Sequence, residues 1–174
     1  MRRTKIYTKK GDKGKTSIKN SRVSKTSDVI RCLAYIDELQ TQMGFLIFNM
    51  YNDAEYFIIK NIQKELFRIS SNIAGYDIKF DASLIKDLEQ RIDEITSSLP
   101  PLKNFIIAGC GMKQQELYAH ACRTKCRLLE TYLPEHTNED IRKFINRLSD
   151  YLFMLVRKYN TNELKIDIKK NKIF

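Results

Sequence analysis

Apolar residues recur every three or four positions in five stretches of the chain, which is the period of an amphipathic helix. The stretches cover residues 29–50, 58–73, 84–99, 112–133 and 139–160. Helix-breaking residues separate several of them, namely Gly75, Pro100, Pro101 and Pro134. The candidate N-caps are Ser27 or Asp28, Asp81 or Ser83, and Asn138.

Five helices with short links predict an all-α fold, an up-and-down five-helix bundle that forms a single domain over residues 1–174. Residues 1–26 form a basic segment before the bundle, which covers 27–160, and residues 161–174 form a basic tail. We expect residues 105–111 to be an apolar connection with glycine breaks, and the tail to be a short strand or disordered. Ferritin-like bundles often carry a di-iron centre, but the Glu-x-x-His pairs that it needs are absent from this sequence.

The net charge of +10 is concentrated at the two ends of the chain. Residues 1–25 contain ten Lys or Arg and one Asp. Residues 157–174 contain six Lys or Arg and two acidic residues. Such ends attract polyanions, which include nucleic acid, anionic lipid and nucleoside triphosphates.

The cysteine pattern and the absence of a targeting segment bear on the compartment. There are four cysteines, no Cys-x-x-Cys motif, no signal peptide and no long apolar run. This pattern predicts a reduced, cytoplasmic protein that is not embedded in a membrane, and it argues against disulfides or a zinc site.

Residues 6–18, IYTKKGDKGKTSI, contain candidate phosphate ligands. The spacing excludes a P-loop, because only two residues separate Gly11 from Gly14 where four are needed. Lysine and hydroxyl side chains beside glycine nevertheless suit a phosphate that approaches the backbone closely. A solvated basic turn is the alternative interpretation of this segment.

Polar residues on the last two helices do not fit a plain bundle. Arg123, Arg127 and Glu130 share one helical face, either as an exposed ion-pair ladder or as two guanidinium groups directed at phosphate with a carboxylate that orients one of them. Asn146, Asp150 and Phe153 lie opposite the leucine stripe of the fifth helix. That face is expected to be a subunit contact or a binding site.

Four segments together resemble the PduO-type ATP:cob(I)alamin adenosyltransferases. They are IYTKKGDKGKTS at 6–17, IDEL at 36–39, HACRTKCRLLE at 120–130 and FINRLSDYLFMLVRKYN at 144–160. They occur in the family's order and span most of the chain. The resemblance implies a homotrimer of five-helix bundles, with ATP bound between neighbouring subunits.

The resemblance also implies roles for individual residues. The N-terminal segment would fold over the ATP triphosphate, with Arg127 from the neighbouring subunit. Asp37 would pair with Arg123 across the interface, and Phe105 would pack beneath the corrin ring. The positions that match ATP contacts are Thr8, Lys9, Lys10, Gly11, Thr16, Ser17, Lys25, Arg127, Glu130 and Asn146.

The chain departs from the family pattern at several positions. Family members usually carry arginine where this chain has Leu128 and Thr131. Lys125 and the surplus N-terminal lysines are candidates to supply the missing charge. The usual Pro-Gly-Gly after the corrinoid-side phenylalanine is Ala108-Gly109-Cys110 here.

The resemblance implies that Co(I) of cob(I)alamin attacks C5′ of ATP and expels triphosphate, with Mg²⁺ as the charge-neutralising ion and no metal site made of side chains. A reductase or a cobalamin-dependent enzyme is an expected partner, and nucleic acid and membranes are not. Two alternatives stay open at this stage. One is a nucleic-acid-binding helical protein that uses its basic ends, and the other is a nucleotide- or corrinoid-binding bundle with weakened catalysis.

Overall fold

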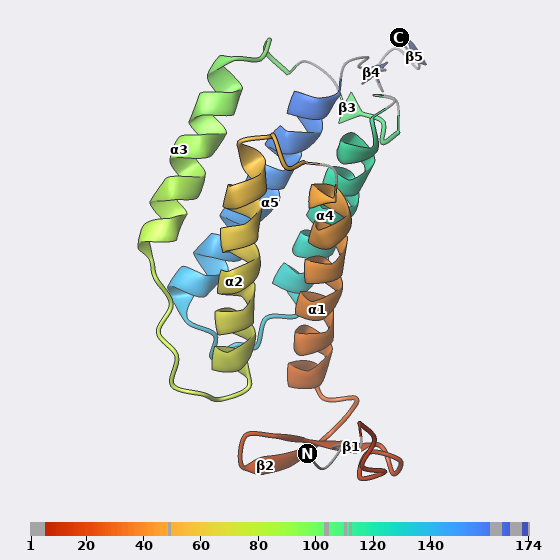
Figure 1. Cartoon of the computed structure of the whole chain (residues 1–174), viewed down its shortest axis with the longest axis vertical. Helices are drawn as coiled ribbons and strands as arrows, with labels where there is room; N and C mark the ends of the chain where they lie inside the picture. The colour runs from red at the N-terminus through yellow and green to blue at the C-terminus, as the bar shows by residue number, and fades with distance from the viewer. Residues whose placement is uncertain are drawn as a thin grey trace.

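The computed structural model describes residues 6–48, 50–102, 105–109, 111, 113–160, 165–167 and 172–173. Its five helices are α1 (Asp28–Ile47), α2 (Glu55–Ile73), α3 (Ser83–Ser97), α4 (Gln114–Thr131) and α5 (Glu139–Tyr159). They run alternately up and down, as Figure 1 shows. The predicted five-helix bundle is confirmed, with helix ends that differ from the predicted ones by a few residues.

The core lies where α4 packs between α1 and α5, while α2 packs on α1 and α3 packs on α5. The apolar stripes predicted for the five helices are buried there; the fully buried side chains include Ile36, Leu39, Leu66, Leu148 and Leu152. Cys32, Cys122 and Cys126 are buried free thiols in this core. Burial raises the pKa of Cys32 to about 11 and that of Cys122 to about 12, so both thiols stay protonated and inert.

The helix starts follow the sequence signals only in part. Asn138 caps α5 as predicted, because its side chain accepts the Asp140 N–H at 2.7 Å. Ser27 precedes α1, but its hydroxyl donates to the Ser24 carbonyl at 2.8 Å instead of capping the helix. The start of α2 lies three residues before the predicted position, where Asp53 accepts the Glu55 N–H at 2.9 Å.

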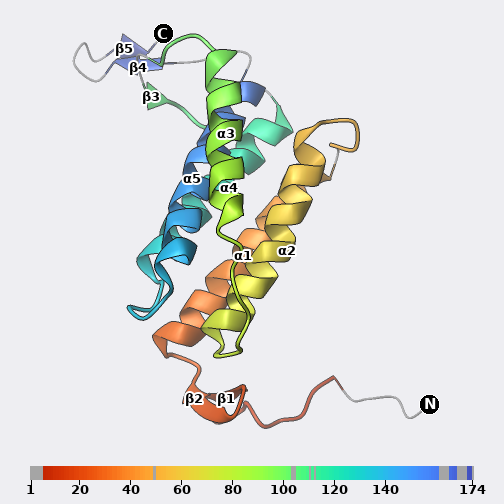
Figure 2. The ribbon, with the colours of Figure 1, turned by 90° about the vertical axis from the view of Figure 1, so that its left-hand side faces the viewer.

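The basic N-terminal segment contains a two-stranded antiparallel hairpin, which the sequence pattern did not predict. Strands β1 (Lys15–Ile18) and β2 (Ser21–Ser24) pair in register from Lys15 with Ser24 to Ile18 with Ser21. The tight turn between them is possible because Lys19 adopts a positive φ of 45°. The hairpin lies beyond the end of the bundle where α1 begins (Figures 1 and 2).

The apolar connection after α3 and the basic tail form a second small sheet. Strand β3 (Phe105–Ile106) pairs antiparallel with β4 (Lys165–Asp167), which pairs with β5 (Lys172–Ile173). Of the two expectations for the tail, the strand is therefore the one observed at these residues. This sheet and the N-terminal hairpin lie at opposite ends of the bundle (Figure 2), so the two basic segments are far apart.

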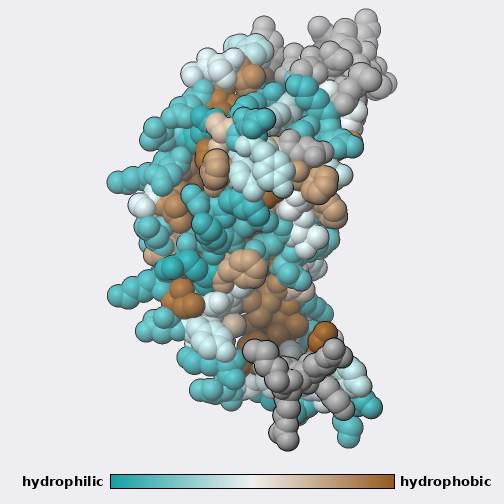
Figure 3. Space-filling model, viewed as in Figure 1, coloured by the Kyte–Doolittle hydropathy of each residue, from teal (hydrophilic) through white to brown (hydrophobic). Residues whose placement is uncertain are grey.

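The surface is mainly hydrophilic on the face that Figure 3 shows, with hydrophobic patches between the polar side chains. Several large apolar residues are exposed on α1 and α2 and just after α1, among them Phe45, Phe48, Phe57 and Phe67. Within the described part of the chain, no helix combines the length and the apolar character that crossing a membrane requires.

Candidate functional site

The N-terminal hairpin brings Gly11 and Lys25 together. A side chain at Gly11 would place its Cβ only 3.0 Å from Lys25 Nζ, so the ammonium group lies directly over the glycine backbone. The Lys25 N–H also donates to the Gly14 carbonyl at 2.9 Å, and Gly14 has a φ of 73° that suits glycine. The glycine turn is therefore folded back onto the end of β2.

The other predicted hairpin residues surround this turn. Thr8, Lys9, Lys10 and Ser17 are exposed, whereas Thr16 is half-buried on β1. Arg22 ties the segment down, because its guanidinium donates to the Lys10 carbonyl at 2.6 Å. In the described part of the chain none of the hairpin's lysines forms an ion pair with a carboxylate, so their charges are available to a polyanion.

Glu130 and Asn146 form the polar contact between α4 and α5. Asn146 Nδ2 donates to Glu130 Oε1 at 2.9 Å, and Arg147 donates to Asn146 Oδ1 at 2.9 Å. Within the described chain Glu130 binds Asn146 and forms no ion pair with an arginine of α4, so its expected role in orienting an arginine stays a prediction. The pair is half-buried, so it presents a fixed carboxylate and amide at the edge of the bundle.

The two arginines of α4 differ in their surroundings. Arg127 is exposed, whereas Arg123 is half-buried with its guanidinium carbon 6.0 Å from the centre of the Phe153 ring. Arg123 Nε is buried without a hydrogen-bond partner. Burial lowers the pKa of Arg123, and the nearby Arg127 charge lowers it further. Lys125, a candidate for the missing charge, is already paired with Glu38 of α1 at 2.5 Å.

A single chain does not bring all the predicted site residues together. Asp37 is exposed on α1 and forms no ion pair with Arg123 within the described chain. The polar contact from the hairpin to the bundle runs from Lys19 to the Gly75 carbonyl after α2, at 2.5 Å, not to α4 or α5. Phe105 lies on β3 at the far end of the bundle, and its side chain is outside the described part of the structure.

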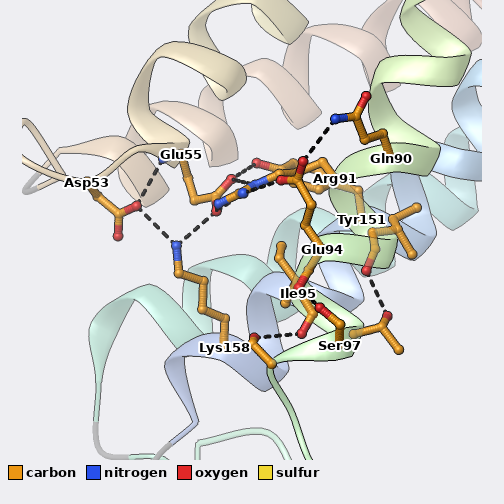
Figure 4. Close-up of polar contacts among 12 residues, drawn as sticks. Asp53, Glu55, Gln90, Arg91, Glu94, Ile95, Ser97, Tyr151 and Lys158 are labelled. Carbon is orange, nitrogen blue, oxygen red and sulfur yellow. Dashed lines mark hydrogen bonds and ion pairs between the residues drawn. The ribbon is translucent and has the colours of Figure 1, made fainter.

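A buried ion-pair cluster joins α2, α3 and α5, and the sequence interpretation missed it. The Glu55 carboxylate is fully buried and is bound by Arg91, by Lys158 Nζ at 2.8 Å and by Tyr151 Oη at 2.7 Å (Figure 4). Burial would raise the pKa of Glu55, but these hydrogen bonds outweigh it and hold the pKa below its ordinary value. Glu55 lies on the same helical face as Ile59 and Ile62. A charged residue on this apolar face was the feature of the sequence that could have predicted a buried ion pair.

Asp53 extends this cluster to the end of α5. It accepts hydrogen bonds from Tyr159 Oη at 2.8 Å and from Lys158 Nζ at 3.3 Å. The charged groups of this cluster bind one another and join three helices, so we interpret the cluster as a structural tie.

Comparison with known proteins identifies the arrangement. The sequence model of the cobalamin adenosyltransferase family matches residues 6–159. The bovine corrinoid adenosyltransferase MMAB is 35% identical, in a match that covers 88% of this chain and 70% of that protein. A corrinoid adenosyltransferase of Bacillus subtilis is 34% identical, with coverage of 90% and 86%.

Solved structures agree with the sequence comparison. A variant of the PduO-type ATP:corrinoid adenosyltransferase from Lactobacillus reuteri, complexed with cobalamin and ATP, superposes with a TM-score of 0.86. It is 29% identical and the match covers 94% of this chain and 97% of that one. Another variant of that enzyme, complexed with ATP, gives a TM-score of 0.81 at 31% identity, with coverage of 89% and 94%. This chain therefore belongs to the cobalamin adenosyltransferase family.

Proposed function

We propose that this protein transfers the 5′-deoxyadenosyl group of ATP to the cobalt of a reduced corrinoid and releases triphosphate. The observation that carries the proposal is the family match over residues 6–159, supported by a solved relative of the same fold that holds both cobalamin and ATP. In the reaction the Co(I) electron pair forms a bond to C5′ while the C5′–O bond to the triphosphate breaks. Reduced cobalt is the nucleophile, so no protein base is needed.

The protein's contribution is positioning and charge stabilisation, since the leaving group is a highly charged triphosphate. We assign the triphosphate to the hairpin turn, where the Lys25 ammonium group lies over Gly11 and the exposed Lys9 and Lys10 immediately precede it in the chain. Thr16 and Ser17 add hydroxyl donors. Mg²⁺ is expected to arrive with the phosphates, because its oxygen preference fits the triphosphate and the hairpin hydroxyls.

We further propose a homotrimer with ATP between subunits. The support is that one chain leaves Arg127, Glu130 and Asn146 away from its own hairpin, so the complete ATP site needs residues from two chains. A cytoplasmic location, and a reductase or cobalamin-dependent enzyme as partner, are consistent with this activity. The missing arginines at Leu128 and Thr131 leave Arg127 as the guanidinium group of that motif.

An anaerobic assay with chemically reduced cobalamin and ATP tests the activity. The expected result is adenosylcobalamin, recognised by its absorption spectrum, together with stoichiometric triphosphate. ATP binding without this product would instead support the catalytically weakened bundle. Salt-dependent binding of random duplex DNA in the absence of product would support the nucleic-acid-binding alternative.

Gly11→Val should weaken ATP binding by about tenfold, because the new side chain displaces the Lys25 ammonium that now lies over Gly11 and removes a charge-assisted contact. The flexible end of Lys25 can move aside, so helicity and assembly should be unchanged. Isothermal titration calorimetry measures the affinity. Gly44→Ala is the control, since nothing lies within 4 Å of its Cβ position. Equal ATP affinity in Gly11→Val and wild type would remove the turn from the site.

Arg127→Ala should lower ATP binding or turnover by roughly ten- to a hundredfold, the contribution of a charge-assisted phosphate contact. Arg127 is exposed, so folding should be little affected. Steady-state kinetics at varied ATP separates KM from kcat. Arg68→Ala, which removes another exposed arginine on α2, is the control. Full activity in Arg127→Ala would leave the hairpin lysines as the triphosphate ligands.

A further inference from the structure

The connection from β3 to α4 is held at its glycines. Gly109 has a φ of 90°, and a side chain there would meet Leu117 at 3.3 Å. A Cβ at Gly111 would lie 3.0 Å from Asn160 Cα, so the connection touches the backbone that follows α5. Only Ile107 and Ala108 separate Gly109 from β3. Whatever fixes Gly109 therefore also fixes the strand that carries Phe105.

A buried carboxylate fixes Gly109 from α4. Glu116 has no exposed surface, and the Gly109 N–H is shared between its two oxygens at 3.2 Å each. Glu116 lies in the first turn of α4, where the helix dipole favours a negative charge. A glutamate at this place ordinarily reaches back to the N-cap N–H. Here it reaches seven residues back and secures the connection instead.

The surroundings of Glu116 offer its carboxylate few hydrogen-bond donors: among the described residues the Gly109 N–H is bonded to it, whereas the buried Nε2 of His120 makes no hydrogen bond. His120 Nε2 lies 3.2 Å from Glu116 Oε1 one turn along α4, and both side chains are buried. Burial lowers the pKa of His120; the Glu116 charge raises it and the Arg123 charge lowers it. An ionised group that loses its water needs such partners, because several kcal/mol of hydration free energy are otherwise lost. Within the described part of the chain, the Gly109 N–H is therefore the group whose hydrogen bond Glu116 would lose first if the connection moved.

We propose that Glu116 is a positioning residue of the corrinoid side: its carboxylate holds Gly109 and so keeps the Phe105 strand in a fixed place relative to α4. The proposal rests on the proposed function, because Phe105 is assigned beneath the corrin ring by that function. Nothing in the sequence motifs marks Glu116, since its partner Gly109 belongs to the segment that departs from the family's Pro-Gly-Gly.

The main test compares Glu116→Met with wild type. Methionine keeps most of the volume but cannot accept the Gly109 N–H, so the fold should survive. In the ligand-free protein, amide hydrogen exchange of residues 106–111 should become faster. The KM for reduced cobalamin should rise, or kcat fall, by about ten- to a hundredfold, because a contact to the corrinoid is misplaced. The affinity for ATP should stay unchanged. Phe105→Ala should show the same separation of corrinoid and ATP effects.

Two further variants make the test specific. Glu116→Gln keeps an acceptor oxygen and should restore both slow exchange and the KM for cobalamin. Glu65→Met makes the same substitution at a buried glutamate in the second half of α2 and should alter neither quantity. Unchanged exchange and KM in Glu116→Met would overturn the proposal. Equal losses in Glu116→Gln and Glu116→Met would also overturn it, because the acceptor would then be irrelevant.

The exchange measurement separates this proposal from the proposed function. If wild type forms no adenosylcobalamin, the function fails. The exchange of residues 106–111 in Glu116→Met still shows whether Glu116 holds the connection, since it needs no substrate.

Discussion

Replacing Glu55 with alanine should lower the free energy of unfolding by about 3–5 kcal/mol, the cost of breaking a buried ion pair by removing one partner. Arg91, Lys158 and Tyr151 all direct hydrogen bonds at this fully buried carboxylate. In the variant Arg91 and Lys158 keep only their outer partners, Glu94 and Asp53, and the buried Tyr151 hydroxyl loses its acceptor. Urea denaturation followed by circular dichroism measures the change.

The control for this variant is Glu94→Ala. Glu94 binds the same guanidinium, with 2.6 Å between Arg91 Nη1 and Glu94 Oε2, but its side chain is 47% exposed. Exposed pairs contribute at most about 1 kcal/mol, so the two variants of one cluster should differ clearly. Equal losses in both would show that the buried part of the cluster contributes no more than its surface part.

The Glu55 cluster also predicts how stability depends on pH. The folded-state pKa of Glu55 lies below its ordinary value of 4.5. A lowered carboxyl pKa stabilises the fold fully above the unfolded-state pKa, and this contribution is lost as the pH falls through the folded-state value. Wild type should therefore lose stability below about pH 4.5 more steeply than Glu55→Ala does. Parallel pH profiles of the two proteins would contradict this.

Periodicity predicted the five helices because each has a continuous apolar stripe that the bundle buries. It could not predict the buried charges. Glu55 and Glu116 lie on those stripes, but their partners are set by tertiary contacts: Arg91 is 36 residues away from Glu55. The N-terminal hairpin was missed for another reason, since its turn places Lys19, and not a glycine, at positive φ.

For the candidate site, sequence motifs identified residues but not their arrangement. The contact of Lys25 with Gly11 depends on the hairpin register, and that of Glu130 with Asn146 depends on how α4 packs on α5. Asp37 and Arg123 were assigned as partners through the family resemblance alone. In that assignment the two residues belong to different subunits, and their pairing stays a prediction.

Arg123→Ala should disrupt the trimer, with a loss of about 3–5 kcal/mol for each interface pair that becomes buried and unpaired. The structure gives a physical reason to expect a partner from another chain. Arg123 Nε is buried without a hydrogen-bond partner, and burial lowers the pKa of the group. Asp37 is an exposed carboxylate on α1 that forms no ion pair in the described chain. Arg123 therefore lacks an acceptor for its Nε–H, and Asp37 lacks a cationic partner within the described chain.

Multi-angle light scattering and sedimentation velocity measure the assembly. Wild type is expected to be trimeric, whereas Arg123→Ala and Asp37→Ala should dissociate at micromolar concentrations. Arg127→Ala, which removes the exposed arginine one turn further along α4, should remain a trimer although it binds ATP weakly. A monomeric wild type, or an intact trimer in Arg123→Ala, would contradict the predicted contact.

A charge exchange separates pairing from loss of packing. Arg123 also lies against Phe153, so alanine removes a cation–π contact within the chain as well as the proposed ion pair. The double variant Asp37→Arg with Arg123→Asp loses that contact but restores opposite charges at every subunit interface of a symmetric trimer. It should therefore assemble better than either single charge reversal, each of which places like charges together. If both single variants and the double variant dissociate equally, Arg123 stabilises the protein through Phe153 and not through Asp37.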